Sequence, residues 1–120
     1  MARTYARFNR EHFGGQLREI PFRLSARMRT RLGQLSVNLK TGEVNEIAIS
    51  RKHLRNGWAE VEKTVLHEMV HQWQVENHLP LDHGPGFRRK AREVGIAPRA
   101  RRKVVGDVIF PVKPLPLSRP

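Results

Sequence analysis

A glutamate and two histidines lie in the segment LHEMVHQWQV, residues 66–75, at a spacing that can hold a metal ion. His67 and His71 are four residues apart, so both imidazoles project from the same face of a helix. Two imidazoles on one helix face can bind one Zn²⁺ ion, and Glu68 then lies beside the ion without being a ligand. A glutamate in this place can accept a proton from water, so the HExxH spacing predicts a zinc-dependent hydrolase.

A catalytic zinc ion needs a third protein ligand and an open fourth position. The metzincin pattern HExxHxxGxxH fails here, because Gln74 and Asn77 stand where its glycine and third histidine belong. His83 follows His71 by twelve residues, in a Gly- and Pro-rich loop that can fold back over the helix. We expect His83 to be the third ligand. A later glutamate, Glu93, and the absence of a third protein ligand are the alternatives.

The composition narrows the kind of metal site. The chain has no cysteine, so disulfides and thiolate ligands are excluded, and His, Asp or Glu must hold any metal. The alternative to a metal site is a surface helix whose two histidines only face water. A chance match to three fixed positions in a chain of this length is on the order of 2%. The position of the motif in the middle of an apolar-striped helix favours the metal site.

The motif requires a long helix with one apolar side, and the residues around it predict one. The apolar positions are spaced by four residues and are Val61, Val65, Met69 and Trp73. Asn56 is the expected N-cap, and the helix should end before Pro80, because proline disfavours helical geometry in the residue before it. A shorter helix is expected in FRRKAREVG, residues 87–95, with Gly95 at its end.

The segments before the motif helix predict a helix and a small sheet. TYARFNREHFGGQL, residues 4–17, has the apolar spacing of a short helix that stops at two glycines. IPFRLSARM, residues 20–28, predicts a strand. Residues 33–50 predict an antiparallel hairpin around the turn KTGE, with an irregularity near Asn45. The predicted fold class is α+β: an N-terminal helix, a short antiparallel sheet, the HExxH helix and a following short helix.

The chain is strongly basic, with a net charge of +12 over 120 residues. The charge is uneven, since residues 1–31 carry +6, residues 32–87 carry −2 and residues 88–120 carry +8. A balance of this size favours a polyanionic partner, most simply nucleic acid bound without sequence preference. The alternative is a solvated basic surface. The expected nucleic-acid contacts are Arg88, Arg89, Lys90, Arg92, Arg99, Arg101, Arg102 and Lys103.

Two segments resemble the SprT-like family of zinc metallopeptidases, which includes the Spartan proteases. They are HEMVHQW, residues 67–73, and DHGPGFRRKAREVGI, residues 82–96. The family shows a helical HExxH followed by HGxxF, and both patterns are present here. FNREHFGGQL, residues 8–17, is also similar to the family's opening helix. The resemblance covers about residues 1–97 and implies a small zincin-like fold.

The resemblance also implies a site and an activity. One Zn²⁺ ion would be bound by His67, His71 and His83, with Glu68 as the catalytic base, and the reaction would be hydrolysis of peptide bonds in protein substrates. In Spartan-type members the substrates are proteins bound or crosslinked to DNA, and DNA switches the activity on. Several members continue with a cysteine-ligated zinc ribbon, which a chain without cysteine lacks. We therefore expect a minimal form whose DNA contacts come from its basic residues.

The organisation follows from these patterns. We expect residues 1–97 to form the metalloprotease domain and residues 98–120 to form a basic and then Pro-rich extension. No apolar run approaches the roughly 18 residues that span a membrane, and the N-terminus has no secretory signal. These features predict a cytoplasmic protein. We expect a monomer, and its basic charge is compatible with association with DNA.

Three functions are compatible with the sequence. The favoured one is a zinc metalloendopeptidase that acts on DNA-associated proteins. The second is a basic nucleic-acid-binding protein whose zinc site is structural or catalytically silent. The third is a zinc hydrolase of a small substrate such as a short peptide. A structural zinc site usually has four protein ligands, so three well-placed ones favour catalysis.

Overall fold

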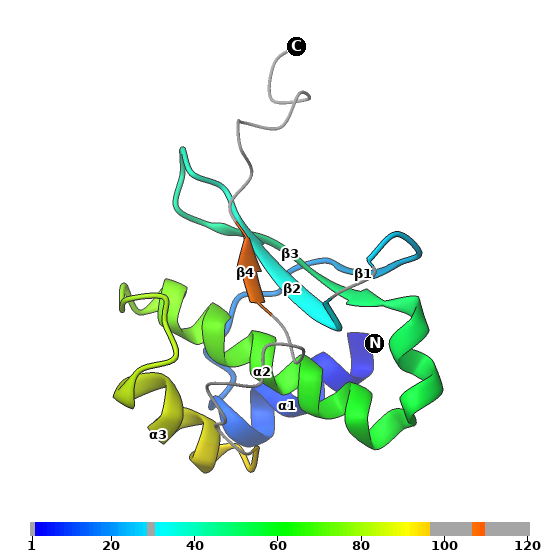
Figure 1. Cartoon of the computed structure of the whole chain (residues 1–120). Helices are drawn as coiled ribbons and strands as arrows, with labels where there is room; N and C mark the ends of the chain where they lie inside the picture. The colour runs from blue at the N-terminus through cyan, green and yellow to red at the C-terminus, as the bar shows by residue number, and fades with distance from the viewer. Residues whose placement is uncertain (1, 29–30, 97–106, 110–120) are drawn as a thin grey trace.

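The predicted HExxH helix is the central element of the fold. In the computed structural model it is α2 (Trp58–Glu76), and the sheet, α1 (Ala2–His12) and α3 (Pro85–Glu93) pack against it (Figure 1). The structure describes residues 2–28, 31–96 and 107–109. Because other elements cover α2 on several sides, 11 of its 19 residues are buried, and it is a core helix rather than a surface helix.

Among the described residues, four strands form one mixed sheet in the order β1-β3-β2-β4. The strands are β1 (Phe22–Ser25), β2 (Gly33–Val37), β3 (Val44–Ser50) and β4 (Asp107–Ile109). The predicted antiparallel hairpin is confirmed as β2 and β3, whereas β1 pairs with β3, and β4 with β2, in parallel. The sequence does not predict the parallel pairings, because long connections separate parallel neighbours along the chain. The predicted α+β class is confirmed.

The hairpin contains the irregularity expected near Asn45. Ser36 pairs with Glu46 and Val37 pairs with Val44, so Asn45 is an extra residue in β3. With the regular alternation of a strand, Asn45 would point to the core face. The bulge brings Val44 to that face instead, where it is buried.

A 3₁₀ helix, η1 (Arg51–Asn56), precedes α2 and corrects its predicted start. Asn56 is not the N-cap, because Gly57 holds that position with a φ of 96°, which glycine adopts without strain. The Asn56 amide instead donates to Nδ1 of His53 at 2.8 Å, and Nε2 of His53 is 2.8 Å from Oγ1 of Thr64. His53 is buried, and its bond to Thr64 joins η1 to α2, while its bond to Asn56 lies within η1.

The C-terminal elements agree with the sequence in part. The predicted short helix is confirmed as α3, which begins two residues earlier than expected, and Gly95 follows its end with a φ of 90°. Of the extension predicted for residues 98–120, the structure describes only the residues of β4, so the rest lies outside the described residues and the boundary at residue 97 remains a prediction. None of the described helices is both long and apolar enough to cross a membrane.

Candidate metal centre

Three imidazoles converge beside the middle of α2. His67 and His71 belong to α2, and His83 belongs to the loop before α3. The Nε2 atoms of His71 and His83 are 3.2 Å apart, and those of His83 and His67 are 3.4 Å apart. Zinc–nitrogen bonds of about 2.0–2.1 Å at a tetrahedral angle separate two ligand nitrogens by about 3.3–3.4 Å. These two separations therefore fit ligation of a single tetrahedral ion.

Burial keeps the imidazole of His67 in the form that a metal binds. His67 is 9% exposed, and burial, with further contributions from the nearby His71 and His83, lowers its pKa to about 3. The ring is therefore neutral at pH 7 and has a free lone pair on one nitrogen. A metal ion can bind this side chain near neutral pH without displacing a proton from it.

Gln74 fixes the orientation and tautomer of His71. Nδ1 of His71 is 2.8 Å from Oε1 of Gln74, and an amide oxygen can only accept, so Nδ1 carries the hydrogen. The lone pair of the neutral ring is then on Nε2, which faces His83. The orientation of the Gln74 amide is fixed from its other side, since Nε2 of Gln74 donates to the backbone oxygen of Asp82 at 3.2 Å. Gln74 is therefore a supporting residue that the motif does not include.

Asp82 holds the loop that carries His83. Its backbone oxygen accepts from Gln74, and its Oδ1 accepts from the backbone N–H of Gly84 at 3.1 Å. The first bond joins the loop to α2, and the second forms a local turn around His83. These two hydrogen bonds therefore hold the loop against the motif helix, as the sequence led us to expect.

Phe87 lies against all three imidazoles. Its ring stacks on His71 with a centroid separation of 4.7 Å, and its centroid is 5.0 Å from that of His67 and 4.8 Å from that of His83. Phe87 is only 2% exposed and lies in the first turn of α3. The ring therefore forms an apolar wall of the site and restricts the imidazoles to their observed orientations.

The two glutamates that the sequence singled out lie in different surroundings. Glu68 is 0% exposed and follows His67 directly on α2. Glu93 lies at the end of α3, where its side chain is 57% exposed and forms an ion pair with Lys90 at 3.1 Å. Within the described residues, the side chains that could jointly hold a metal ion are the three histidines, without Glu93.

Of the eight basic residues predicted to contact nucleic acid, four lie within the described residues and four lie outside them. Arg88, Arg89, Lys90 and Arg92 belong to α3, directly after the histidine loop. Lys90 has structural contacts, because its ammonium lies 5.2 Å from the ring centroids of Phe13 and Trp73 and pairs with Glu93. The other four lie outside the described residues and are Arg99, Arg101, Arg102 and Lys103.

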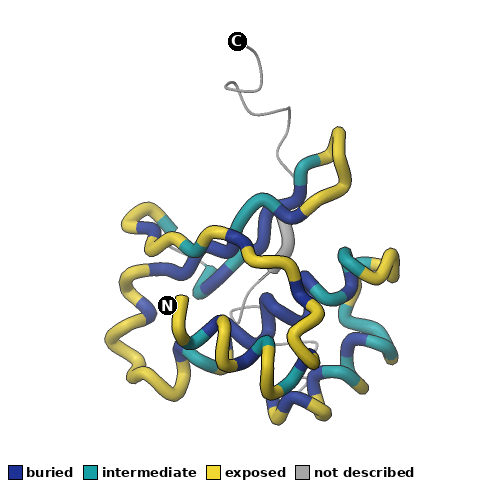
Figure 2. Tube along the Cα trace, turned by 180° about the vertical axis from the view of Figure 1, so that it is seen from behind, coloured by how far each residue is buried: buried dark blue, intermediate teal, exposed yellow. Residues whose placement is uncertain are grey.

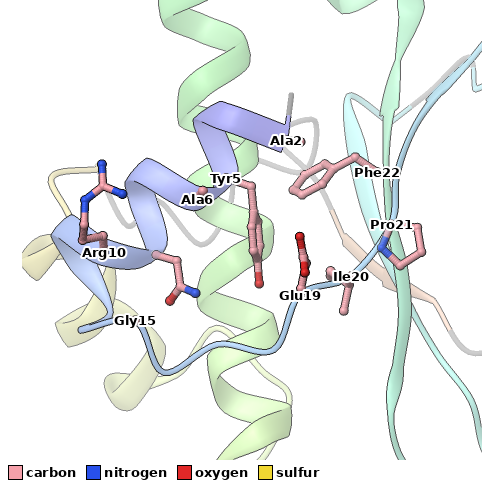
Figure 3. A pocket seen from close by; sticks show the side chains of 10 residues that line it. Ala2, Tyr5, Ala6, Arg10, Gly15, Glu19, Ile20, Pro21 and Phe22 are labelled. Atoms are coloured by element: carbon pink, nitrogen blue, oxygen red, sulfur yellow. The ribbon is translucent and has the colours of Figure 1, made fainter.

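A pocket of about 630 Å³ opens on another side of α2, between α1 and the segment that leads into β1 (Figure 3). The ring of Tyr5 lines it, and the Tyr5 hydroxyl donates to the carbonyl oxygen of Arg18 at 2.6 Å and lies 3.1 Å from Oε1 of Gln72. Burial raises the pKa of Tyr5 to about 12, so this hydroxyl stays protonated. Gln72 projects about 140° away from His67 around the helix axis, so the pocket is separate from the histidines.

Comparison with known proteins gives one family. The model of the SprT-like family matches residues 1–105, which include the three histidines, Glu68 and the whole of α3. A search among curated proteins finds no match.

Proposed function

The chain belongs to the SprT-like family, and from this premise we propose that it is a zinc-dependent endopeptidase that hydrolyses peptide bonds in protein substrates. The observation that carries the proposal is the convergence of His67, His71 and His83, with Nε2 separations of 3.2 and 3.4 Å. Imidazole nitrogens without thiolates suit zinc, and three protein ligands are the usual number in a catalytic site. The family match and the geometry support the same reading.

Each residue of the proposed site has a distinct role. His67, His71 and His83 hold the ion, while Gln74 and Phe87 keep their rings in place. A bound zinc ion supplies Lewis acidity, which polarises the scissile carbonyl group and makes water a better nucleophile. Glu68 accepts a proton from the attacking water and then delivers a proton to the nitrogen of the leaving amine.

We further propose that the substrates are proteins associated with DNA. The net charge of +12 supports this part, since a chain with this charge attracts polyanions. Arg88, Arg89 and Arg92 are on α3, which begins two residues after His83, so a polyanion bound to them lies close to the histidines. A DNA-bound protein would then be presented to the site.

Substitution of Glu68 by glutamine tests the enzyme assignment. We expect Glu68→Gln to bind one zinc ion per chain and to cleave nothing, because an amide cannot accept the proton from water. The measurement is zinc stoichiometry together with cleavage of a basic DNA-binding protein, with and without DNA. His83→Ala is the matched control and should lose both zinc and activity. Cleavage by Glu68→Gln at the wild-type rate would remove Glu68 from the mechanism.

The same assay distinguishes the second candidate, a nucleic-acid-binding protein with a silent zinc site. The net charge of +12 supports this candidate too, because it favours DNA binding whether or not the protein is an enzyme. It predicts DNA binding by the wild-type protein, no cleavage of any protein substrate and no difference between the wild-type protein and Glu68→Gln.

A further inference from the structure

A second basic surface lies at the N-terminal end of α2, where the sequence suggests none. It combines η1 with the loop that follows β1, and Ser50 joins these two segments. The backbone N–H of Ser50 donates to the carbonyl oxygen of Leu32 at 2.9 Å, and Oγ of Ser50 donates to that of Met28 at 3.3 Å. Figures 1 and 2 show the loop and η1 on the same side of the molecule. We call Arg27, Arg51, Lys52 and Arg55, together with Leu54 and Trp58, the η1 surface.

The cations of the η1 surface are available to a ligand. All four are exposed, and no ion pair is found for them among the described residues. The acidic residues nearest to η1 along the chain already have partners, since Glu46 pairs with Arg23 at 2.7 Å and Glu60 pairs with Lys63 at 3.1 Å. The η1 surface therefore carries an uncompensated positive charge, although residues 32–87 sum to −2.

Two exposed apolar side chains lie close to these cations along the chain. Trp58 is 47% exposed and Leu54 is 42% exposed. Trp58 is the only aromatic residue among the large apolar side chains that are exposed in the described part of the chain. Cations interleaved with an exposed aromatic ring match the chemistry of single-stranded nucleic acid, because the cations contact phosphates and the ring stacks on a base. A duplex keeps its bases stacked inside and offers only the phosphates.

The backbone that presents these side chains is well fixed. Buried His53 is hydrogen-bonded to Thr64 of α2, which joins η1 to α2. The side-chain amide of Asn56 forms a second hydrogen bond to the His53 ring. Gly57, with its φ of 96°, turns the chain directly from η1 into α2. A ligand therefore meets preformed groups and orders little backbone on binding.

We propose that the η1 surface binds single-stranded nucleic acid, with Arg51, Lys52 and Arg55 on phosphates and Trp58 stacked on a base. This inference deepens the proposed function, because it rests on a nucleic-acid partner and locates that partner. Trp58 lies nine residues before His67, or about 14 Å along the axis of α2. A strand bound there leaves the histidine site open to a protein attached to the strand.

The test compares two triple variants that remove the same charge. One is Arg51→Gln/Lys52→Gln/Arg55→Gln, and the control, at exposed cations outside both the η1 surface and α3, is Arg3→Gln/Arg10→Gln/Lys40→Gln. Fluorescence anisotropy measures binding of the full chain to a labelled oligothymidylate of about 20 nucleotides at several salt concentrations. We expect the η1 variant to bind about tenfold more weakly or worse, with a salt dependence reduced by about 2 in log–log slope. The control variant should change the affinity by less than about threefold.

Trp58 tests the single-stranded part of the proposal. Trp58→Ala should weaken oligothymidylate binding about fivefold or more and leave the affinity for a duplex of the same length unchanged. Trp58→Phe keeps a ring and should retain most of the single-strand affinity. Unchanged thermal unfolding verifies that the variants are folded, which is expected because these side chains are exposed.

Three results would overturn the proposal. The first is no binding by the wild-type chain. The second is an η1 variant that binds no more weakly than the control variant. The third is a Trp58→Ala effect that is the same for duplex and single strand. Binding is measured without a protein substrate, so failure of the proposed protease activity leaves this test intact. Conversely, an η1 variant that binds no strand but still cleaves a DNA-free protein would leave the enzyme proposal intact.

Discussion

At the scale of single residues, the histidine site depends on a side chain outside the HExxH motif. Gln74 accepts from Nδ1 of His71 and donates to Asp82, so one amide orients a ring on α2 and holds the loop that carries His83. Hydrogen bonds of this kind keep a ligating nitrogen pointed at the metal and its lone pair available. Because Gln74 is 2% exposed, no water can replace it easily.

We predict that Gln74→Ala weakens zinc binding by about 10- to 100-fold, because His71 loses its acceptor and the His83 loop loses its anchor. Competition with a chromophoric chelator measures the affinity. Gln74→Glu is the matched control, since it keeps an acceptor for Nδ1 of His71 and should weaken binding less than alanine does. Wild-type affinity in Gln74→Ala would show that the amide has no supporting role.

At the scale of elements, the attachment of η1 to α2 depends on a neutral histidine. The Asn56 amide can only donate to Nδ1 of His53, so Nε2 carries the hydrogen and donates to Thr64. A proton on Nδ1 would oppose the Asn56 amide. Burial lowers the pKa of His53 below its ordinary value, so the folded state resists protonation more than the unfolded state does.

We predict that this junction makes the protein less stable in mild acid. The unfolded chain binds a proton at His53 below a pH of about 6.5, whereas the folded chain does not until a lower pH, so the free energy of unfolding falls as the pH drops below about 6.5. Urea unfolding of metal-free protein at several pH values measures this. His53→Gln should show a shallower decline, because His67, with its lowered pKa, contributes equally to both proteins. Identical pH dependence in the two proteins would contradict the prediction.

At the scale of the whole molecule, the proposed metal joins the central helix α2 to the loop that leads into α3. His67 and His71 are on the central helix, whereas His83 is on a loop held by Gln74 and Asp82. An ion bound to all three ties α3 and its loop to the core. A ligand that binds only the folded chain stabilises it in proportion to the logarithm of its concentration.

We therefore predict that zinc raises the melting temperature. At a free concentration of about 100 times its Kd, the gain is about 2.7 kcal/mol, which corresponds to a rise of about 10 °C for a domain of this size. Differential scanning calorimetry with zinc or with a chelator measures the change. His83→Ala should show little response to zinc. A melting temperature that is the same with zinc and with chelator would argue against a site formed by three ligands.

The net charge of a segment does not show where its basic side chains lie on the folded surface. The residues 32–87 sum to −2, yet they contribute Arg51, Lys52 and Arg55 to a basic surface. Glu46 pairs with Arg23 and Glu68 is buried, so neither compensates the charge of this surface. Basic side chains consequently gather near both ends of α2, on η1 and on α3.

Local patterns in the sequence determined much of this protein. The spacing of His67 and His71 places them on one helix face, the alternation in residues 33–50 specifies the hairpin, and the extra residue at Asn45 is visible in that alternation. Helical and strand periods act over a few residues, so they can be read directly from the chain. The family resemblance also appears in short motifs, whereas the catalytic role of Glu68 stays a prediction.

Only the tertiary structure decided the features that depend on segments far apart in the chain. The parallel pairings of β1 and β4, the contact of Phe87 with three imidazoles and the link from Gln74 to Asp82 all require the folded arrangement. The same holds for the joining of η1 to the loop after β1. Hydrogen bonds and packing act over a few ångströms in space, and sequence separation carries no information about which distant residues will meet at that range.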